Sequence, residues 1–407
     1  MALPVPKVEI GFDLTESPIG PFLRLDDPEA GKLGSPDYRL GGTIFYDVTD
    51  RTRTATSARG RPNEFASFPA GQLSIEFNNH DRAFDPLFEA SPFYGNIVPR
   101  REVRLSVDGE RVFSGWIEDW DLEYLPNGDS VVTAIAYDAF YIITNQTLTE
   151  FTPSVETVAE RINTVLDRPG VGWSSDLRNI EFSTQNVGAY IVDEGTNALA
   201  YLQNLVTAEP GNLFVDKGGS IAFTNRDTYP TTADLVEIGE GGVPFDSLRV
   251  IYGAEQLYNE ITITRKDGGT AIASDLASQG AYGIRAFNQT DLLVETDAQA
   301  LEIALDYATR FSQPEYRIEA AEIDLQKASA EHESDILGLE IGSVVKSTFT
   351  PNSVPPAIVK YLEVINIEHV ITTDSHYVTL GFKEITYAPL VLDDAVFGML
   401  DVGTLGR

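Results

Sequence analysis

The four histidines are the residues of this sequence best suited to hold a metal ion or to transfer a proton near neutral pH. They stand at positions 80, 332, 369 and 376, and none has the H-E-x-x-H spacing of a zinc hydrolase. His369 and His376 flank an expected hairpin turn, so we predict that both lie at the surface. Cysteine is absent, which excludes thiolate ligands, cysteine nucleophiles and disulfides. No G-x-S-x-G elbow, P-loop or G-x-G-x-x-G turn occurs, so the sequence predicts no catalytic residue, no metal site and no cofactor.

The segment 78–86 is the part of the chain richest in oxygen ligands. It contains Asn78, Asn79, Asp81 and Asp85, whose side chains could bind calcium. It lacks the Asp/Asn alternation, central glycine and terminal glutamate of an EF-hand loop. Asn and Asp side chains also satisfy nearby backbone groups in turns, and Pro86 would fix the exit of such a turn. We therefore interpret the segment as a structural turn, with calcium binding as the alternative.

The acidic net charge limits the kinds of molecule that the chain can bind. The chain has 407 residues with 62 acidic and 29 basic side chains, a formal net charge of -33. Duplex binding depends on Lys and Arg displacing counterions, so sequence-specific nucleic-acid recognition is excluded, whereas solubility or a saline habitat fits the acidity. The apolar run 131–143 is interrupted by Asp138 and is too short for a membrane helix. The N-terminus shows no secretory signal.

The segment 43–138 alternates apolar and polar residues, as half-buried antiparallel strands do. Asp108-Gly109 and the turn 126–128 would each join two such strands into a hairpin. A continuous series of hairpins without a helical period predicts a closed or nearly closed barrel.

The pattern becomes helical between residues 150 and 248. A first helix is predicted to begin at Thr152-Pro153 and to end at Arg168, and a second to run from Thr196 to about Ala208. A hairpin turning at 217–219 follows.

Strand character returns at 258–265. Before the strands resume, the spacing predicts a helix. Its apolar face consists of Leu301, Ala304, Leu305, Ala308 and Phe311. The last hairpin, 361–382, has the same layout as 115–138, which suggests an internal duplication. The predicted fold class is mainly β with an α+β insertion. The predicted domains are a tube-like antiparallel β-barrel at 1–149, a mixed α/β domain at 150–248, a second tube-like barrel at 249–387 related to the first by duplication, and a C-terminal tail at 388–407.

The segment 68–104 carries the most specific motif. An A-G-x-L strand leads into D-R-x-F-D-P, then S-P-F-Y-G and P-R-R-E-V-R. This string resembles minor tail proteins of long-tailed, siphovirus-like bacteriophages, which form the baseplate hub at the tail tip. The matching positions are Gly71, Asp81, Arg82, Phe84, Asp85, Pro86, Ser91, Pro92, Tyr94, Gly95, Pro99, Val103, Arg104, Gly115 and Trp120. The departures are His80, Phe93 and Glu102.

The resemblance implies a structural protein of the virion, located at the tail tip, and not an enzyme. It implies a homotrimer whose two barrels per chain present six similar barrels to a ring of distal tail protein above. Other tip or fibre proteins would lie below, and the tape-measure protein would occupy the lumen. A lumen lined with carboxylates would let DNA pass without sticking, which is a second explanation of the acidity.

Two segments receive specific roles in this interpretation. We expect the turns 78–86 and 91–95 to be scaffold at a ring interface, with Phe84 packed and Arg82 paired to a nearby carboxylate. The tail 392–407 is expected to be a docking strap that reaches a neighbouring protein. Its apolar residues include Leu392, Val396, Phe397 and Leu400.

Two alternatives remain open. A carbohydrate-binding tail-tip protein could use Trp116, Trp120 and Trp173, although the even spacing of Trp116 and Trp120 places them on one face of a strand and favours packing. A hub enzyme that cleaves cell wall would need an additional domain with a carboxylate or metal site, whereas only a short tail follows Tyr387.

Overall fold

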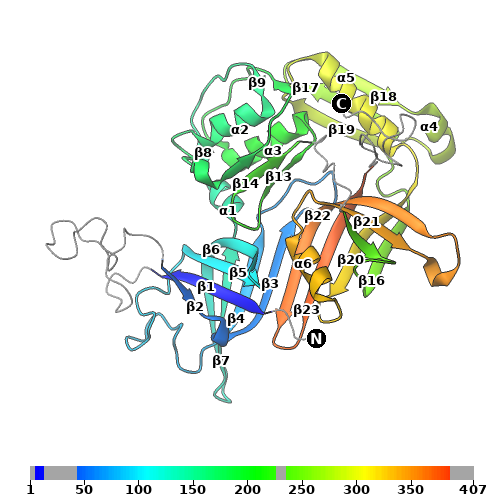
Figure 1. The fold of residues 1–407 in the computed structure, drawn as a ribbon. Coiled ribbons are helices and arrows are strands. Elements are labelled where there is room, and N and C mark those ends of the chain that lie inside the picture. Colours follow the sequence, from blue (N-terminus) through cyan, green and yellow to red (C-terminus); the bar gives the residue numbers. More distant parts are fainter. Residues whose placement is uncertain (1–4, 13–43, 226–234, 386–407) are drawn as a thin grey trace, which may run out of the picture.

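The computed structural model describes residues 5–12, 44–225 and 235–385, and one large β-sheet forms its centre. Figure 1 shows this sheet below two smaller units that contain most of the helices. The sheet has 13 strands, and nearly all neighbouring strands are antiparallel, whereas β15 and β21 pair in parallel. The prediction of a mainly β chain is therefore confirmed.

The first half of the sheet comes from the N-terminal third of the chain. Its strands are β1 (Pro6–Phe12), β2 (Ile44–Asp47), β3 (Thr52–Gly60), β4 (Gln72–Asn78), β5 (Arg101–Val107), β6 (Glu110–Tyr124) and β7 (Ser130–Tyr137), with a short 3-10 turn η1 (Thr49–Arg51). Asp108 and Gly109 join β5 to β6 with φ angles of 48° and 88°, which is the geometry of a tight hairpin turn. The two hairpins predicted in this segment are confirmed.

The second half of the sheet comes from the C-terminal part of the described chain. Its elements are β15 (Val236–Gly239), β16 (Ser247–Gly253), β20 (Glu315–Asp324), α6 (Ala330–Gly338), β21 (Val344–Phe349), η3 (Pro351–Ser353), β22 (Ile358–Thr372) and β23 (His376–Glu384). The strands follow the order β16-β20-β23-β22-β3-β4-β7-β6-β5-β1-β2, with β21 and β15 branching from β22. The order β20-β23-β22-β21 in this half repeats the order β4-β7-β6-β5 in the first half. The two halves join where β22 pairs with β3.

Alternation of side chains along each strand forms the first of two hydrophobic cores. Leu73, Ile75 and Phe77 of β4 are buried on one face, while Ser74 and Glu76 lie on the other. The loop 79–100 and helix α6 contribute Phe84 and Ile336 to this same core.

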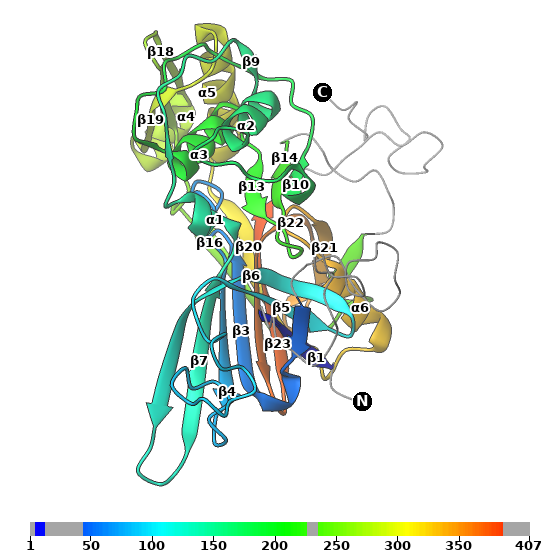
Figure 2. The ribbon, with the colours of Figure 1, turned by 90° about the vertical axis from the view of Figure 1, so that its left-hand side faces the viewer.

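A second hydrophobic core lies in the two smaller units above the sheet. The first unit contains α1 (Ala139–Ile143), β8 (Thr147–Leu148), β9 (Glu156–Thr157), α2 (Val158–Leu166), η2 (Ser175–Leu177), β10 (Arg178–Ile180), β11 (Asn186–Val187), β12 (Thr196–Asn197), α3 (Ala198–Ala208), β13 (Asn212–Val215) and β14 (Ile221–Thr224). The second contains β17 (Glu260–Arg265), β18 (Thr270–Ser274), α4 (Leu276–Tyr282), β19 (Ala286–Leu292) and α5 (Asp297–Phe311). Figure 2 shows both units at the same end of the sheet. Of the helices in the described ranges, none is long and apolar enough to cross a membrane.

Two helix predictions need correction. Helix α2 begins at Val158 and not at Thr152-Pro153, because Thr157 and Glu160 form a capping box there. In α5 the predicted apolar face is wrong at two positions, since Leu301 and Leu305 are 42% and 53% exposed. The helix instead buries Ala300, Ile303, Ala304 and Phe311.

The two tryptophans of β6 do not share a face, contrary to the prediction from their spacing. The pairing of β6 with β7 shifts by one residue between Ile117 and Asp119, which is a β-bulge. Because one extra residue reverses the alternation, Trp120 packs against the first core, while Trp116 packs against the second.

Candidate assembly interface

Phe84 is the centre of the motif segment and is fully buried. Its ring stacks on Phe77 at 4.6 Å, on Phe93 at 5.4 Å and on Trp120 at 5.9 Å between ring centroids. The indole Nε1 of Trp120 donates to the carbonyl of Val98 at 3.2 Å. The loop 79–100 is therefore anchored on β4 and β6 through aromatic rings.

The polar residues around Phe84 bond to one another within the loop. Arg82 pairs with Asp85 at 2.7 Å, as predicted. Asp85 also accepts from the Leu87 N–H at 2.8 Å and from the Tyr124 hydroxyl at 2.9 Å. Burial alone would raise the pKa of Asp85, but these hydrogen bonds and Arg82 together hold that pKa below its ordinary value. The charged carboxylate therefore stabilises the turn.

Asp81 pairs with Arg51 and not with Arg82. Arg51 donates to both of its carboxylate oxygens at 2.8 and 2.7 Å, and the Ala83 N–H donates to it at 3.2 Å. Desolvation alone would raise the pKa of Asp81, but these contacts together lower it. Within residues 5–12, 44–225 and 235–385, no group of three or more His, Asp or Glu side chains could hold a metal ion. Asp81 and Asp85 make the local contacts of a structural turn.

The remaining motif residues complete the loop. The Ser91 hydroxyl donates to the Ala83 carbonyl and accepts from the Phe93 N–H at 3.0 Å. Gly95 has a φ angle of 77°, a conformation that glycine adopts without strain. One side of the loop packs on the sheet, and the other side presents exposed apolar groups, including Leu87 at 84% exposure. The exposed motif residues of the loop are Asp81, Arg82, Pro86, Pro92, Tyr94, Gly95 and Pro99.

Gly71 lies outside this cluster, at the start of β4. Its N–H donates to Asp138 Oδ2 at 2.6 Å, and a Cβ at this position would stand 2.7 Å from that oxygen. Asp138 also accepts from the Phe140 N–H at 2.9 Å and caps α1. Burial raises the pKa of Asp138 to about 7 although both N–H groups act in the opposite direction. Gly71 therefore links the sheet to the helical units. The predicted docking residues Leu392, Val396, Phe397 and Leu400 lie outside the described residues.

Edge pairing between β3 and β22 joins the two halves of the sheet. The register runs from Asn366 opposite Gly60 to Thr372 opposite Thr54. A Cβ on Gly60 would meet the Ile365 carbonyl oxygen at 2.3 Å, so the backbones approach too closely there for any other residue. Arg59 is buried beside this pairing and donates to Glu340 at 2.7 Å.

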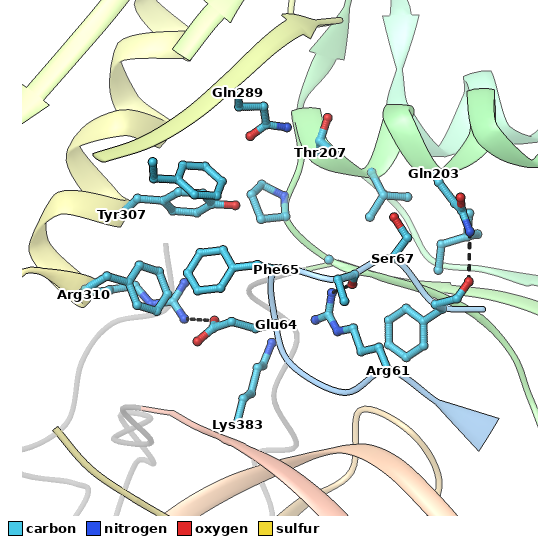
Figure 3. A pocket seen from close by; sticks show the side chains of 18 of the residues that line it. Arg61, Glu64, Phe65, Ser67, Gln203, Thr207, Gln289, Tyr307, Arg310 and Lys383 are labelled. Carbon is cyan, nitrogen blue, oxygen red and sulfur yellow. Dashed lines mark hydrogen bonds and ion pairs between the residues drawn. The ribbon is translucent and has the colours of Figure 1, made fainter. Parts of the chain in front are cut away.

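A cavity of about 290 Å³ lies above this junction, between the loop after β3, the end of α3 and helix α5. Figure 3 shows Phe65 and Tyr307 on one side of it and Arg61 on another, with Arg310 donating to Glu64 at 2.7 Å. Burial lowers the pKa of Arg61, and its Nε has no hydrogen-bond partner among the described residues. The aromatic wall and the guanidinium could hold a small polar ligand.

Sequence reasoning did not find Arg59 or Arg61. No sequence signal singled them out, because Arg51 and Arg53 have the same spacing a few residues earlier.

The prediction that His369 and His376 lie at the surface is wrong. Both are buried, and His369 Nδ1 lies 3.0 Å from His376 Nε2. His369 lies on the face of β22 that also carries Ile367 and Ile371 of the first core, so its position near a turn does not expose it. Burial holds the pKa of His369 well below its ordinary value and lowers that of His376 to about 4.

The tryptophans proposed for glycan binding are engaged in packing. Trp116 contacts Trp173 edge to face at 5.9 Å, and both pack against the second core. Trp120 packs on Phe84 at 5.9 Å. All three are half-buried.

No protein-family model and no curated protein sequence matches the chain. The tail protein from Neisseria meningitidis MC58 has a TM-score of 0.59 and 10% identity, covering 84% of this chain and 94% of that one. The 43 kDa tail protein of prophage MuSo2 from Shewanella oneidensis has a TM-score of 0.54 and 14% identity, with the same two coverages of 84% and 94%.

A third similar structure comes from a secretion system. The E. coli c3393 protein, a component of the type VI secretion system described as similar to the phage T4 tail proteins gp27 and gp5, has a TM-score of 0.51 and 10% identity. The match covers 83% of this chain and 74% of that one. This chain therefore has the fold of phage tail proteins, as its motif indicates.

Proposed function

We propose that the protein is a structural component of a virus tail tip, a baseplate hub that closes the tail tube and passes DNA during infection. The observation that carries the proposal is that a chain with the tail-protein fold contains two sheet halves of the same strand order, joined edge to edge. Three such chains would supply six similar units, which converts the sixfold symmetry of a tube into a threefold tip.

The registers of the two halves support an internal duplication. Ala134 of β7 lies between Trp120 and Ile75, and Leu380 of β23 lies between Ile367 and Ala321 in the same way. Both long hairpins contain a bulge at the corresponding place, before Asp119 in β6 and before Asn366 in β22. The loop 79–100 and the segment with α6 follow equivalent strands and cover the same face. We assign these two halves to the two tube-like barrels.

The polar face of the sheet suits a lumen through which DNA passes. Carboxylates on the face opposite the first core include Glu76, Asp119, Asp121, Glu123, Glu322 and Glu368, and all are half-buried or exposed. A surface of this charge repels phosphates and prevents DNA from sticking. A tape-measure protein would occupy this lumen before infection.

The domain boundaries and the remaining partners belong to this proposal. The predicted boundaries 1–149, 150–248, 249–387 and 388–407 are kept as a proposal for barrel, mixed domain, barrel and tail. Two parts of the chain depart from them, because β15 and β16 belong to the large sheet and residues 260–311 pack with the mixed domain in the second core. A distal tail protein ring would bind above and other tip or fibre proteins below, with the exposed side of the loop 79–100 at a ring interface. The tail 392–407 would dock on a neighbouring protein.

Sedimentation of the purified protein, together with a density map of the intact virion, tests the hub assignment. We expect a trimer in solution and threefold density at the tail tip that this chain fits. A stable monomer in solution and no such density at the tip would contradict the proposal.

Deletion of residues 392–407 tests the docking role separately. The melting temperature of the isolated protein should stay within about 2 °C of the parent, because a change below about 0.5 kcal/mol shifts a chain of this size by no more. Tail assembly should fail. A collapse of the fold would show that the segment belongs to the core of its own subunit.

A further inference from the structure

Strands β16 and β6 of the large sheet each have an edge with which no described strand pairs. Strand β16 pairs with β20 along one edge only. Residues 119–124 of β6 pair with β7, whereas β5 reaches only to Ile117 on the other side. Open strand edges present backbone groups that readily pair with another chain.

The pairing of β3 with β22 within the chain, called the seam below, shows how such edges pair. In β22, the residues up to Glu363 pair with β21, and those from Asn366 onward pair with β3. By strand order β6 is the equivalent of β22, and β16 is the equivalent of β3. The open edge of β6 therefore corresponds to the part of β22 that is occupied by β3.

The equivalent residues of the two halves determine the register in which β6 would pair with β16 of another copy. Trp120 corresponds to Ile367, because both lie opposite the equivalent residues Ala134 and Leu380. Leu248 corresponds to Ala55 in the same way, through Ala321 and Ile75. Ile367 pairs with Arg59, four residues after Ala55, so Trp120 would pair with the residue four positions after Leu248, which is Tyr252.

We propose that the open edge of β6, residues 119–124, pairs antiparallel with the open edge of β16 in a second copy of this chain, with Trp120 opposite Tyr252 and Glu123 opposite Arg249. This inference rests on the proposed hub function and names the surface through which its subunits bind. The contact is heterologous, since each copy offers β6 to one neighbour and β16 to the other, and three copies close it into a ring.

The side chains on the two edges complement each other. Tyr252 is 71% exposed in the single chain and would be covered by Trp120 and Val98. Leu122 and Val250 already pack on the first core from their own sides and would become neighbours across the seam. Glu123 and Arg249 carry opposite charges, and directly opposed charges of opposite sign stabilise a strand pair.

Strand β16 has a glycine, Gly253, at the position equivalent to Gly60 of β3. Gly60 makes the close approach to Ile365 inside the chain, and Gly253 holds the equivalent position in β16. In the single chain a Cβ on Gly253 would meet no atom within 4 Å. The proposed seam places the backbone of Glu118 at this position.

Cysteine cross-linking tests the register directly, because the natural chain has no cysteine. Glu123→Cys and Arg249→Cys in one chain should form intermolecular disulfides on mild oxidation, since opposed residues of antiparallel strands lie within disulfide reach. The matched control combines Asp121→Cys with Arg249→Cys, which are two residues out of register. We expect at least about tenfold more cross-linked dimer and trimer from the in-register pair, because diagonal neighbours lie beyond good disulfide geometry.

A charge exchange gives a second readout that does not depend on cysteine. Glu123→Arg alone and Arg249→Glu alone should each weaken trimer formation in sedimentation, and the double exchange should restore it. Melting of each variant as a monomer at low concentration verifies that its fold is intact. Restoration of the trimer by the double variant supports the seam even if the cysteine variants fold poorly.

The outcomes separate this inference from the hub proposal. A trimer that forms normally, with equal cross-linking in both cysteine pairs and no rescue by charge exchange, would overturn the proposed seam and leave the hub intact. A wild-type chain that remains monomeric at several hundred micromolar, with no trimer in the virion, would overturn both.

Discussion

At the scale of single residues, Phe84 fastens a long irregular loop to the sheet. Its ring is fully buried among three other aromatic rings, so truncation would leave a cavity that rigid neighbours cannot fill. We expect Phe84→Ala to lower the free energy of unfolding by about 3 to 5 kcal/mol. Denaturant titration measures this, with Leu87→Ala in the same loop as the control, because Leu87 is exposed and its loss should cost less than about 0.5 kcal/mol. Equal losses in the two variants would show that Phe84 is not a core residue.

The buried pair His369 and His376 should make stability fall on acidification. An unfolded histidine takes up a proton near pH 6.5, whereas burial lowers the pKa of His376 to about 4. Between these two values the unfolded chain binds more protons than the folded one, so stability is lost as the pH falls. The nearby cations Arg59 and Lys217 act in the same direction on His369, while Asp108 and Asp324 oppose the shift at His376.

The measurement compares denaturation midpoints from pH 7.5 to pH 4 for the wild type and a His376→Gln variant. For His376 alone the loss across this range is on the order of 3 kcal/mol, from 1.36 kcal/mol per pKa unit. The variant should lose correspondingly less, whereas the control His332→Gln, at a half-buried site on α6, should follow the wild type. Parallel curves for His376→Gln and the wild type would contradict the assignment.

The turn residues could be predicted from the sequence, because their chemistry is local. Arg82 and Asp85 are three residues apart, and Asn and Asp side chains bond to backbone groups two or three positions away. The burial of the histidine pair was missed, because it depends on the first core, to which distant residues such as Ile75 and Phe84 contribute, and not on the nearby turn. Residue-level inference therefore succeeds where the surroundings of a side chain are local in sequence.

At the scale of elements, the β3–β22 seam depends on close contact between two backbones at Gly60. A Cβ there would meet the Ile365 carbonyl oxygen at 2.3 Å, and the φ angle of 118° is strained for any other residue. We expect Gly60→Ala to destabilise the protein by about 2 to 4 kcal/mol, from strain and overpacking combined.

Gly128→Ala is the matched control for this element. Gly128 also has a positive φ angle, 89°, but a Cβ at this position would meet no atom within 4 Å, so only strain of about 1 kcal/mol is expected. Thermal melting of the two variants separates the contributions. If Gly60→Ala cost no more than Gly128→Ala, the seam would be flexible enough to open.

The elements themselves were predictable to different degrees. Hairpins with tight turns, such as the one at Asp108 and Gly109, follow from local pattern and are confirmed. The bulge before Asp119 was missed, because the even spacing of Trp116 and Trp120 hides the inserted residue, which turns Trp116 toward the other core. The start of α2 was predicted too early. Thr152-Pro153 has the sequence pattern of a helix start, but the helix begins after the capping box formed by Thr157 and Glu160.

At the scale of the whole molecule, the repeated layout of two distant hairpins predicts an internal duplication of one barrel. In the structure the strand order β4-β7-β6-β5 recurs as β20-β23-β22-β21 within one continuous sheet. The sequence could not indicate that the halves join through β3 and β22, since any pair of open edges has the same backbone chemistry. Nor could it show that β17, β18 and β19 form a unit inserted between β16 and β20, because short strands look alike wherever they pack.

The net charge should influence assembly of the proposed trimer. Each chain has a formal net charge of -33, so three chains that come together repel one another over distances longer than any single ion pair. Added salt screens this repulsion, with a Debye length that falls from about 30 Å at 0.01 M to about 8 Å at 0.15 M.

We therefore expect the trimer to become more stable as sodium chloride is raised from about 10 to about 300 mM, even though salt weakens the proposed Glu123–Arg249 contact. Sedimentation at fixed protein concentration measures the trimer fraction. A Glu322→Gln, Glu368→Gln variant, with two carboxylates removed from the polar face, should form trimers at lower salt than the parent. If the trimer instead dissociates as salt rises, attraction at the seam outweighs the net repulsion, and the carboxylates of the polar face do not limit assembly.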